Sequence, residues 1–286
     1  MERADIAIIG TGPGGVSAAI TAKIRGKTLY LFGNSHLSEK IEKAKTILNY
    51  PGLPNVSGME LADRMRQQLH LLDIPIREAQ VTAVYAMGDY FAIQTPTEML
   101  EASTVILAAG VTNGKNLPGE AELLGRCVSY CATCDAPFYR GKTVAVVGYS
   151  RHSCEEADFL SEVAAQVLYF PAAPHELALS PGIQVIRDLP VAIENKVLVG
   201  KSGTHYPVDG VFILRSAVAP DKLVPGIALA GNHVAVNSRM ETNLPGLFAC
   251  GDIVGPPYQY IKAAGQGNIA ALSAVEYLRK QKEKQL

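Results

Sequence analysis

The chain has 286 residues, of which 48% are hydrophobic and 19% are charged. At roughly 150 residues per domain this length predicts about two domains, and the composition excludes a disordered chain or a small disulfide-held scaffold. The formal net charge of −1 offers no global field for nucleic acid or an anionic membrane. The sequence has no N-terminal targeting pattern and no run of about 18 apolar residues, so we expect a cytoplasmic protein without membrane or nucleic-acid partners.

The first elements predict a nucleotide-binding unit. A short apolar strand at 5–10 precedes a glycine-rich turn, a helix at 16–23 and a second strand at 28–32. The turn has the pattern G-x-G-x-x-G and consists of Gly10, Thr11, Gly12, Pro13, Gly14 and Gly15. Its glycines let the backbone approach a pyrophosphate, which then lies at the positive end of the helix. The acidic residue that usually follows the second strand and binds a ribose is absent, since Gly33 and Asn34 stand there.

The next segment predicts packing rather than chemistry. Ser57 and Glu60 form a capping-box pattern at the start of a helix with one apolar face. Short alternating runs then predict an antiparallel meander, at 81–85, 90–94 and 99–102. A separate, continuously apolar strand is expected at 104–110.

Strand, turn and helix patterns recur further along the chain. A second unit starts with a strand at 143–148 and continues with a helix at 154–163 and a strand at 167–170. Near the C-terminus, a buried strand at 247–252 ends in Asp252, whose carboxylate is placed to bind a sugar alcohol, and a long helix follows. This alternation of buried strands and helices predicts an α/β fold with parallel sheets.

The cysteines give the most specific chemical signal. They are five in number, and an odd count argues against a secreted disulfide framework. The pentapeptide CATCD contains the C-x-x-C pair Cys131 and Cys134, which can close a disulfide, and Asp135 is placed to supply or accept a proton. A structural metal would need two more ligands at matching spacing, so no metal site is predicted. With Cys127 the spacing also matches the iron–sulfur motif of radical S-adenosylmethionine enzymes, which would require a barrel of repeated strand and helix units.

The glycine-rich turn, the central CATCD, the second Rossmann-type turn and the final strand ending in Gly-Asp together resemble low-molecular-weight thioredoxin reductases along the whole chain. The resemblance implies an α/β fold of two Rossmann-like, three-layer domains of the FAD/NAD(P)-binding type, the second inserted in the first. It implies an FAD domain at 1–112 and 235–286, and an inserted redox-disulfide domain at 113–234 with a degenerate NADPH-type fold. FAD is the implied cofactor, thioredoxin the implied substrate, and a homodimer the implied assembly.

The resemblance also implies the site residues. Cys131, Cys134 and Asp135 are expected to be catalytic. The residues expected to bind FAD are Gly10, Gly12, Pro13, Gly14, Gly15, Lys40, Ile41, Asn49, Val81, Ala109, Gly110, Gly251, Asp252, Gln259, Tyr260 and Ile261. Lys40 stands in the sequence SEKI, where the family usually has Gly-Gly-Gln-Leu, and Lys262 is also expected near the flavin.

The implied mechanism assigns one role to each residue of the pentapeptide. Electrons pass from the reduced flavin to Cys134, after which Cys131 attacks the disulfide of thioredoxin and Asp135 manages the protons. Rotation of the inserted domain is expected to alternate access between the flavin and the protein partner.

The inserted domain departs from the pattern of an NADPH site. Its turn keeps Gly148, but Tyr149 and Ser150 stand where the backbone has to touch a pyrophosphate. The sequence Pro-Ala-Ala at 171–173 replaces the basic pair that holds a 2′-phosphate. These departures resemble the ferredoxin-dependent flavin thioredoxin reductases, which implies reduced ferredoxin as the electron donor.

Two alternative functions stay open at this point. One is an NAD(P)H-dependent thioredoxin reductase whose atypical nucleotide site uses Arg151, His152 or His175. The other is a flavin-bearing redox sensor without enzymatic activity, although the intact CATCD and glycine-rich turn oppose that reading.

Overall fold

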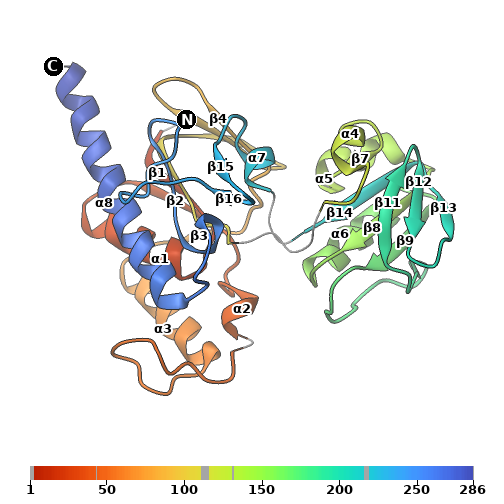
Figure 1. Cartoon of the computed structure of the whole chain (residues 1–286), viewed down its shortest axis with the longest axis horizontal. Helices are drawn as coiled ribbons and strands as arrows, with labels where there is room; N and C mark the ends of the chain where they lie inside the picture. Colours follow the sequence, from red (N-terminus) through yellow and green to blue (C-terminus); the bar gives the residue numbers. More distant parts are fainter. Residues whose placement is uncertain (1–2, 43, 111–115, 131, 216–218, 286) are drawn as a thin grey trace. The chain divides into compact units, whose positions relative to one another are not determined.

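The computed structural model describes residues 3–42, 44–110, 116–130, 132–215 and 219–285. The chain folds into two compact units: unit 1 consists of Met1–Val111 and Ala219–Leu286, and unit 2 is Thr112–Val218 (Figure 1). The chain returns to unit 1 at 219, earlier than the expected residue 235. The segment between belongs to unit 1 because helix α7 (Pro220–Leu223) contacts strand β4, and strand β16 (His233–Val234) contacts the 3-10 helix η2.

Unit 1 is built on a seven-stranded sheet in the order β3-β2-β1-β6-β5-β4, with β17 also paired to β6. The strands are β1 (Ala4–Ile9), β2 (Leu29–Phe32), β3 (Ile76–Arg77), β4 (Ala83–Ala86), β5 (Phe91–Gln94), β6 (Met99–Leu107) and β17 (Leu247–Ala249). Strand β1 pairs in parallel with both β2 and β6. Its central position explains why the first apolar run is buried on both faces.

Strand β6 joins two segments that the sequence pattern separated. Residues 99–102 pair antiparallel with β5, whereas residues 102–107 pair parallel with β1. The strands expected at 99–102 and 104–110 are therefore one nine-residue strand. The polar Thr104 interrupts the apolar pattern but not the strand, because its buried hydroxyl donates a hydrogen bond to the carbonyl oxygen of Asp5.

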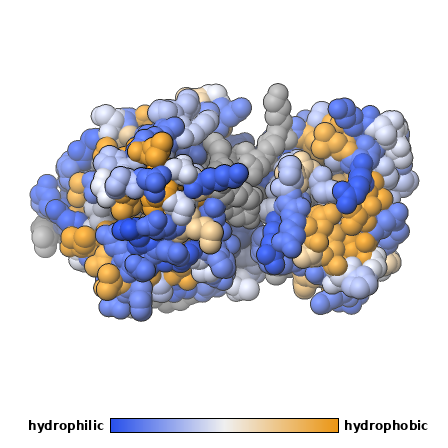
Figure 2. Space-filling view, turned by 90° about the horizontal axis from the view of Figure 1, so that it is seen from below, coloured by the Kyte–Doolittle hydropathy of each residue, from blue (hydrophilic) through white to orange (hydrophobic). Residues whose placement is uncertain are grey.

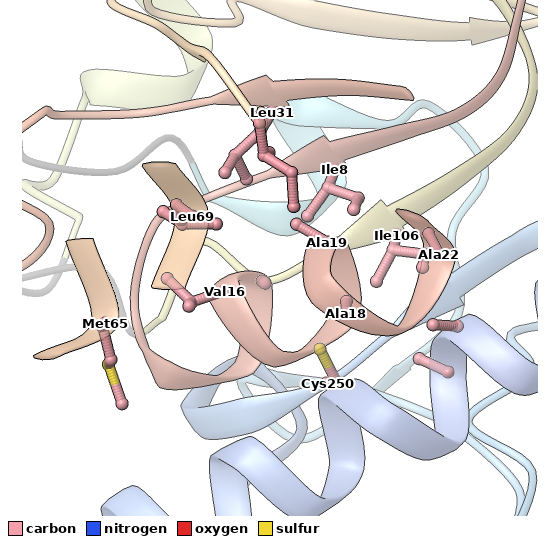
Figure 3. Packing of buried hydrophobic residues seen from close by; sticks show 14 of the residues in the cluster. Ile8, Val16, Ala18, Ala19, Ala22, Leu31, Met65, Leu69, Ile106 and Cys250 are labelled. Carbon is pink, nitrogen blue, oxygen red and sulfur yellow. The ribbon is translucent and has the colours of Figure 1, made fainter. Parts of the chain in front are cut away.

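Helices α1 (Pro13–Ile24) and α8 (Tyr260–Gln285) pack against each other on one face of this sheet (Figure 3). The hydrophobic core where these helices meet the sheet contains strand residues such as Ile8 and Ile106. It also contains small residues of α1 such as Ala18 and Ala22. Helix α3 (Gly58–Leu71) covers the adjoining part of this core through its predicted apolar face. The helix begins as predicted, with Ser57 Oγ accepting from the Glu60 N–H, but the Glu60 carboxylate binds Arg64 instead of completing the capping box.

Unit 2 contains a five-stranded parallel sheet with the order β10-β9-β8-β14-β7. The strands are β7 (Val128–Ser129), β8 (Thr143–Gly148), β9 (Gln166–Pro171), β10 (Gln184–Val185) and β14 (Gly210–Leu214). On one face, Val144 and Val146 pack with helices α5 (Ala132–Asp135) and α6 (His152–Ser161). On the other, Ala145 and Val147 pack with the antiparallel sheet of β11 (Pro190–Glu194), β12 (Val197–Gly200) and β13 (His205–Pro207). Successive residues of β8 therefore face opposite sides of the parallel sheet. Unit 2 thus has three layers, namely the helices, the parallel sheet and the antiparallel sheet, which confirms the predicted α/β class.

The other elements are short. They are α2 (Glu39–Glu42), α4 (Glu120–Leu123), η1 (Ala136–Tyr139), β15 (Leu229–Ala230) and η2 (Gly251–Val254). Within the described ranges, none of the helices has both the length and the hydropathy needed to span a bilayer. The face drawn in Figure 2 is largely hydrophilic, with hydrophobic patches on both units.

Candidate active site and cofactor pocket

A pocket lies where parallel strands of unit 1 end. Ala108 follows β6 and Cys250 follows β17, and the turn after β1 leads into α1. The hollow has a volume of about 480 Å³ including space open to solvent. Its lining residues are Gly12, Pro13, Gly14, Ser38, Ile41, Ala108, Cys250, Gly251, Asp252, Tyr258, Gln259, Tyr260 and Ala263. Doubly wound sheets bind their ligands at this edge.

The glycines of the first turn have two different roles. Gly10 has a φ of +116°, and a β-carbon there would stand 2.3 Å from the Ala108 carbonyl oxygen. Gly15 also lies against backbone, so both residues allow close packing. Around Gly12 an added β-carbon would meet no protein atom within 4 Å, although Gly12 lines the pocket. No side chain caps the start of α1, so its first N–H groups are left for a ligand such as a pyrophosphate.

Side chains of α8 hold the opposite wall of the pocket. Gln266 Oε1 accepts a hydrogen bond of 3.0 Å from the Gly251 N–H. The Lys262 ammonium donates to the carbonyl oxygens of Gly251 at 2.8 Å and Gly255 at 2.6 Å. These three bonds fix the η2 turn, which carries Asp252 into the pocket wall.

Two further hydrogen bonds tie residues around the pocket to distant parts of unit 1. Asn49 Nδ2 donates to Gln259 Oε1 at 2.7 Å, which joins positions 210 residues apart in the sequence. The Tyr258 hydroxyl lies 2.8 Å from His233 Nε2, and Tyr258 itself is 51% exposed. The loop between α2 and α3 therefore reaches the start of α8, as the predicted role of Asn49 requires.

The structure places the predicted FAD-binding residues in three groups. Those that line the pocket are Gly12, Pro13, Gly14, Ile41, Gly251, Asp252, Gln259 and Tyr260. Those beside it are Gly10, Gly15 and Asn49. Those that are not part of its lining are Val81, Ala109, Gly110 and Ile261, of which Val81 is buried and Ile261 exposed. Lys40 belongs to α2, and its side chain lies outside the described part of the chain.

Five lining residues were not among the predicted FAD-binding residues: Ser38, Ala108, Cys250, Tyr258 and Ala263. The available signal was topological, because Ala108 and Cys250 directly follow parallel strands of one sheet. The Cys250 thiol is fully buried. Burial raises the pKa of this thiol to about 12, so it stays protonated at neutral pH.

Residues Ala132–Asp135 of the pentapeptide CATCD form the short helix α5 of unit 2. Its Ala132 is buried in the α5–α6 layer, and the Ala132 N–H donates to Glu156 Oε2 of α6 at 3.2 Å. Cys131 and the side chain of Cys134 lie outside the described residues, so their pairing and the role of Asp135 stay predictions. The neighbouring Cys127 is buried as a free thiol. The two doubly wound units contradict the barrel that the iron–sulfur alternative requires.

The carboxyl edge of the unit 2 sheet is filled by the chain itself. A β-carbon on Gly148, the retained glycine of the degenerate turn, would stand 2.0 Å from the Tyr169 hydroxyl. That hydroxyl lies 2.6 Å from Ser153 Oγ and 2.7 Å from His175 Nε2. Burial raises the pKa of Tyr169, so the phenol stays neutral and hydrogen-bonded. The Tyr169 hydroxyl therefore links the start of α6 to the loop after β9 directly beside the degenerate turn.

A second group of side chains closes the same edge at β14. Arg215 directly follows this strand, and its Nη2 lies 2.8 Å from Glu120 Oε2 in an ion pair that is almost entirely buried. The guanidinium carbon of Arg215 is 5.2 Å from the ring centre of Tyr149. The Tyr130 hydroxyl donates to Glu120 Oε1 at 2.9 Å. Burial alone would raise the pKa of Glu120, but Arg215 and the Leu117 N–H hold it below its usual value.

The residues proposed for an atypical nucleotide site all have partners within unit 2. Arg151 lies 3.8 Å from a Glu176 oxygen. His152 lies 2.9 Å from a carboxylate oxygen of its helix neighbour Glu155. His175 is held between Tyr169 and the Ala173 carbonyl oxygen. Arg151 and His152 are thus paired with carboxylates at the surface, and the His175 ring is held by two hydrogen bonds.

The comparisons with known proteins agree along the whole chain. The pattern of the pyridine nucleotide-disulphide oxidoreductase family matches residues 4–267. The thioredoxin reductase of Aquifex aeolicus is 32% identical, over 98% of this chain and 94% of its own length. The chain belongs to the thioredoxin reductases.

Solved structures of this family share the fold closely. The crystal structure of a ferredoxin-flavin thioredoxin reductase from Clostridium acetobutylicum is 49% identical with a TM-score of 0.96, covering 99% of both chains. A thioredoxin reductase from Gloeobacter violaceus is 30% identical with a TM-score of 0.84, covering 98% of this chain and 95% of its own. These similarities confirm the predicted pair of Rossmann-like folds.

Members of the family are flavoproteins that bind FAD, and the unit 1 pocket fits this cofactor. The bare Gly12 and the uncapped start of α1 suit a pyrophosphate. The Asp252 carboxylate in the wall suits a sugar hydroxyl. This chain is thus an FAD-dependent oxidoreductase of the thioredoxin reductase type.

Proposed function

We propose that the chain reduces the disulfide of thioredoxin through Cys131 and Cys134, with electrons supplied by reduced ferredoxin. Family membership supports thioredoxin as the substrate. The filled carboxyl edge of unit 2 is the observation that carries the choice of donor. A relative with 49% identity bears the name ferredoxin-flavin thioredoxin reductase, which points in the same direction.

The argument against a pyridine nucleotide as donor is steric and electrostatic. NAD(P)H has to bring its pyrophosphate against the glycine-rich turn at the end of the first strand. In unit 2 the position that corresponds to the ligand-facing Gly12 is Ser150, which carries a side chain, and the Arg215 guanidinium lies over the ring of the adjacent Tyr149. Separating Glu120 from Arg215 within this edge would leave a buried charge unpaired, at a cost of about 3–5 kcal/mol.

The proposed chemistry is a two-electron thiol–disulfide exchange. FAD bound in unit 1 would supply the two-electron chemistry that reduces the Cys131–Cys134 disulfide. The Cys131 thiolate attacks one sulfur of the thioredoxin disulfide, and the released thioredoxin thiolate takes up a proton. Cys134 then attacks Cys131, which frees the second thioredoxin thiol and re-forms the pair. Asp135 is the proposed proton carrier, and two reduced ferredoxins supply the two electrons.

The proposed cofactor contacts follow the geometry of unit 1. Gly12, Pro13 and Gly14 would receive the pyrophosphate, and Gly251 and Asp252 the sugar part. Ile41, Gln259 and Tyr260 would line the remaining wall, with Asn49 holding Gln259. Gly10 and Gly15 shape the turn, and contacts of Lys40, Val81, Ala109, Gly110 and Ile261 stay predictions of the family resemblance.

An anaerobic titration of the yellow protein tests the donor. NADPH, NADH and chemically reduced ferredoxin are added separately, and the flavin absorbance near its visible maximum is followed. We expect bleaching by ferredoxin and none by either nucleotide on the time scale of turnover. Rapid bleaching by NADPH would refute the proposed donor, and a protein that is reduced by ferredoxin but never reduces thioredoxin would favour the redox-sensor alternative.

We also propose a homodimer and a cytoplasmic location. Exposed apolar residues follow one side of α8, namely Ile261, Ile269 and Leu272. Positions 8 and 3 residues apart lie on one helical face, so this stripe is a candidate surface for a second copy. Light scattering after gel filtration tests the assembly, and a monomeric mass at micromolar concentration would contradict it.

A further inference from the structure

Lys262 stands in an unusual place for an ammonium group. It is the third residue of α8, and its side chain is half-buried behind the η2 turn. Its two hydrogen bonds go to the carbonyl oxygens of Gly251 and Gly255, at the two ends of this turn. Gly251 and the adjoining Asp252 line the FAD pocket, whereas Lys262 does not. The ammonium therefore contacts the backbone of a residue in the pocket wall.

The local surroundings disfavour this charge. The first turn of a helix carries the positive end of the helix dipole, which repels a cation. Burial lowers the pKa of the Lys262 ammonium, and the neighbouring Asp252 only partly opposes this effect. Lys262 therefore violates the usual charge preference at a helix start, and such violations mark functional sites.

A bound anion would remove this imbalance. The pocket of unit 1 fits FAD, whose pyrophosphate carries negative charge and whose flavin gains negative charge on reduction. The turn that Lys262 holds is also the turn that carries Asp252. The same ammonium can thus fix the backbone of the cofactor wall and balance the charge that the cofactor brings.

We propose that Lys262 is a positioning residue for FAD, which holds the Gly251–Gly255 turn by hydrogen bonds and stabilises the reduced cofactor by its charge. The proposal rests on the FAD pocket of unit 1. It does not depend on ferredoxin, thioredoxin or the cysteine pair. Either of the two proposals can therefore fail while the other stands.

The test compares three variants of the full-length protein. Lys262→Met removes the charge and the donors, Lys262→Arg keeps both, and Lys280→Met makes the same change at an exposed lysine of α8 that pairs with Glu276. FAD dissociation from the holoprotein is measured by flavin fluorescence on dilution. The midpoint potential of the bound flavin is measured by equilibration with a reference dye at saturating FAD.

We expect Lys262→Met to bind FAD at least tenfold more weakly and Lys280→Met to bind it as the unaltered protein does. In Lys262→Met the equilibrium between oxidised and reduced flavin should shift about tenfold toward the oxidised form. This shift lowers the midpoint potential by about 30 mV for a two-electron couple. Lys262→Arg should restore most of both losses. If Lys262→Met does not fold, Lys262→Gln, which keeps a donor without the charge, should show the shifted potential.

Two results would overturn the proposal. One is an unchanged flavin potential together with unchanged FAD affinity in Lys262→Met or Lys262→Gln. The other is an equal loss of FAD in Lys262→Met and Lys262→Arg without a change of potential, because this pattern indicates that only the packing of α8 was disturbed.

Discussion

Gly15 lies so close to Gly10 that a β-carbon on Gly15 would stand 1.8 Å from the Gly10 carbonyl oxygen. Gly12, between them in the same motif, would place a β-carbon in open space at the pocket. One sequence pattern thus contains a residue required by packing and a residue required by the ligand. The two requirements can be separated by the same substitution at the two positions.

We expect Gly12→Ala to fold normally and to lose FAD, because the added methyl group projects toward the ligand. Gly15→Ala should instead destabilise the fold by roughly 1–3 kcal/mol, since the methyl group collides with backbone that cannot move aside. Thermal melting of the two FAD-stripped proteins and FAD titration of each provide the measurement. Equal melting temperatures for the two variants would contradict this separation.

Serine in place of Cys131 or Cys134 should abolish thioredoxin turnover. Cys131→Ser lacks the nucleophile for the thioredoxin disulfide, and Cys134→Ser cannot resolve the mixed disulfide. The loss should exceed about 1,000-fold with either variant, while the bound FAD spectrum is retained. Cys127→Ala is the matched control, since this thiol is buried and free outside the proposed pair. Thioredoxin-coupled insulin reduction reports the rate, and undiminished turnover in either serine variant would remove the pair from the mechanism.

Removing one partner of the Glu120–Arg215 pair should destabilise unit 2 strongly. Arg215→Met leaves the Glu120 carboxylate buried without its guanidinium, at a cost of roughly 3–5 kcal/mol. In the double variant Glu120→Gln with Arg215→Met no charge is left buried, so most of this loss should be recovered. Urea unfolding of the single and double variants measures the coupling. Additive effects would mean that the two side chains do not stabilise each other.

The buried thiols should be chemically silent in the native protein. Cys127, Cys154 and Cys250 are buried and free, and burial raises the pKa of the Cys250 thiol to about 12. Iodoacetamide reacts with thiolates, so the reduced native protein should be alkylated only at the proposed redox pair. Peptide mass spectrometry before and after unfolding in guanidinium distinguishes the sites. Labelling of Cys250 as fast as of Cys134 would contradict its burial.

The sequence by itself determined the chemistry that local patterns encode. The turn from Gly10 to Gly15 predicted a nucleotide site because a strand precedes it and a helix follows it, which is the context that this motif requires. The altered turn at Gly148 predicted that unit 2 had lost such a site, and CATCD predicted the redox pair. Family resemblance then followed from the order of these motifs, which needs no knowledge of distant contacts.

Only the tertiary structure decided which residues meet. Ala108 and Cys250 became pocket residues because β6 and β17 end at one edge of a sheet. Tyr169 fills the space in front of Gly148 because β8 and β9 are paired, and Arg215 finds Glu120 across 95 positions of sequence. The family resemblance implied that Lys262 lies near the flavin, but only the tertiary structure shows that its ammonium holds the η2 turn. Contacts between distant residues depend on strand order and loop closure, and local propensity does not encode either.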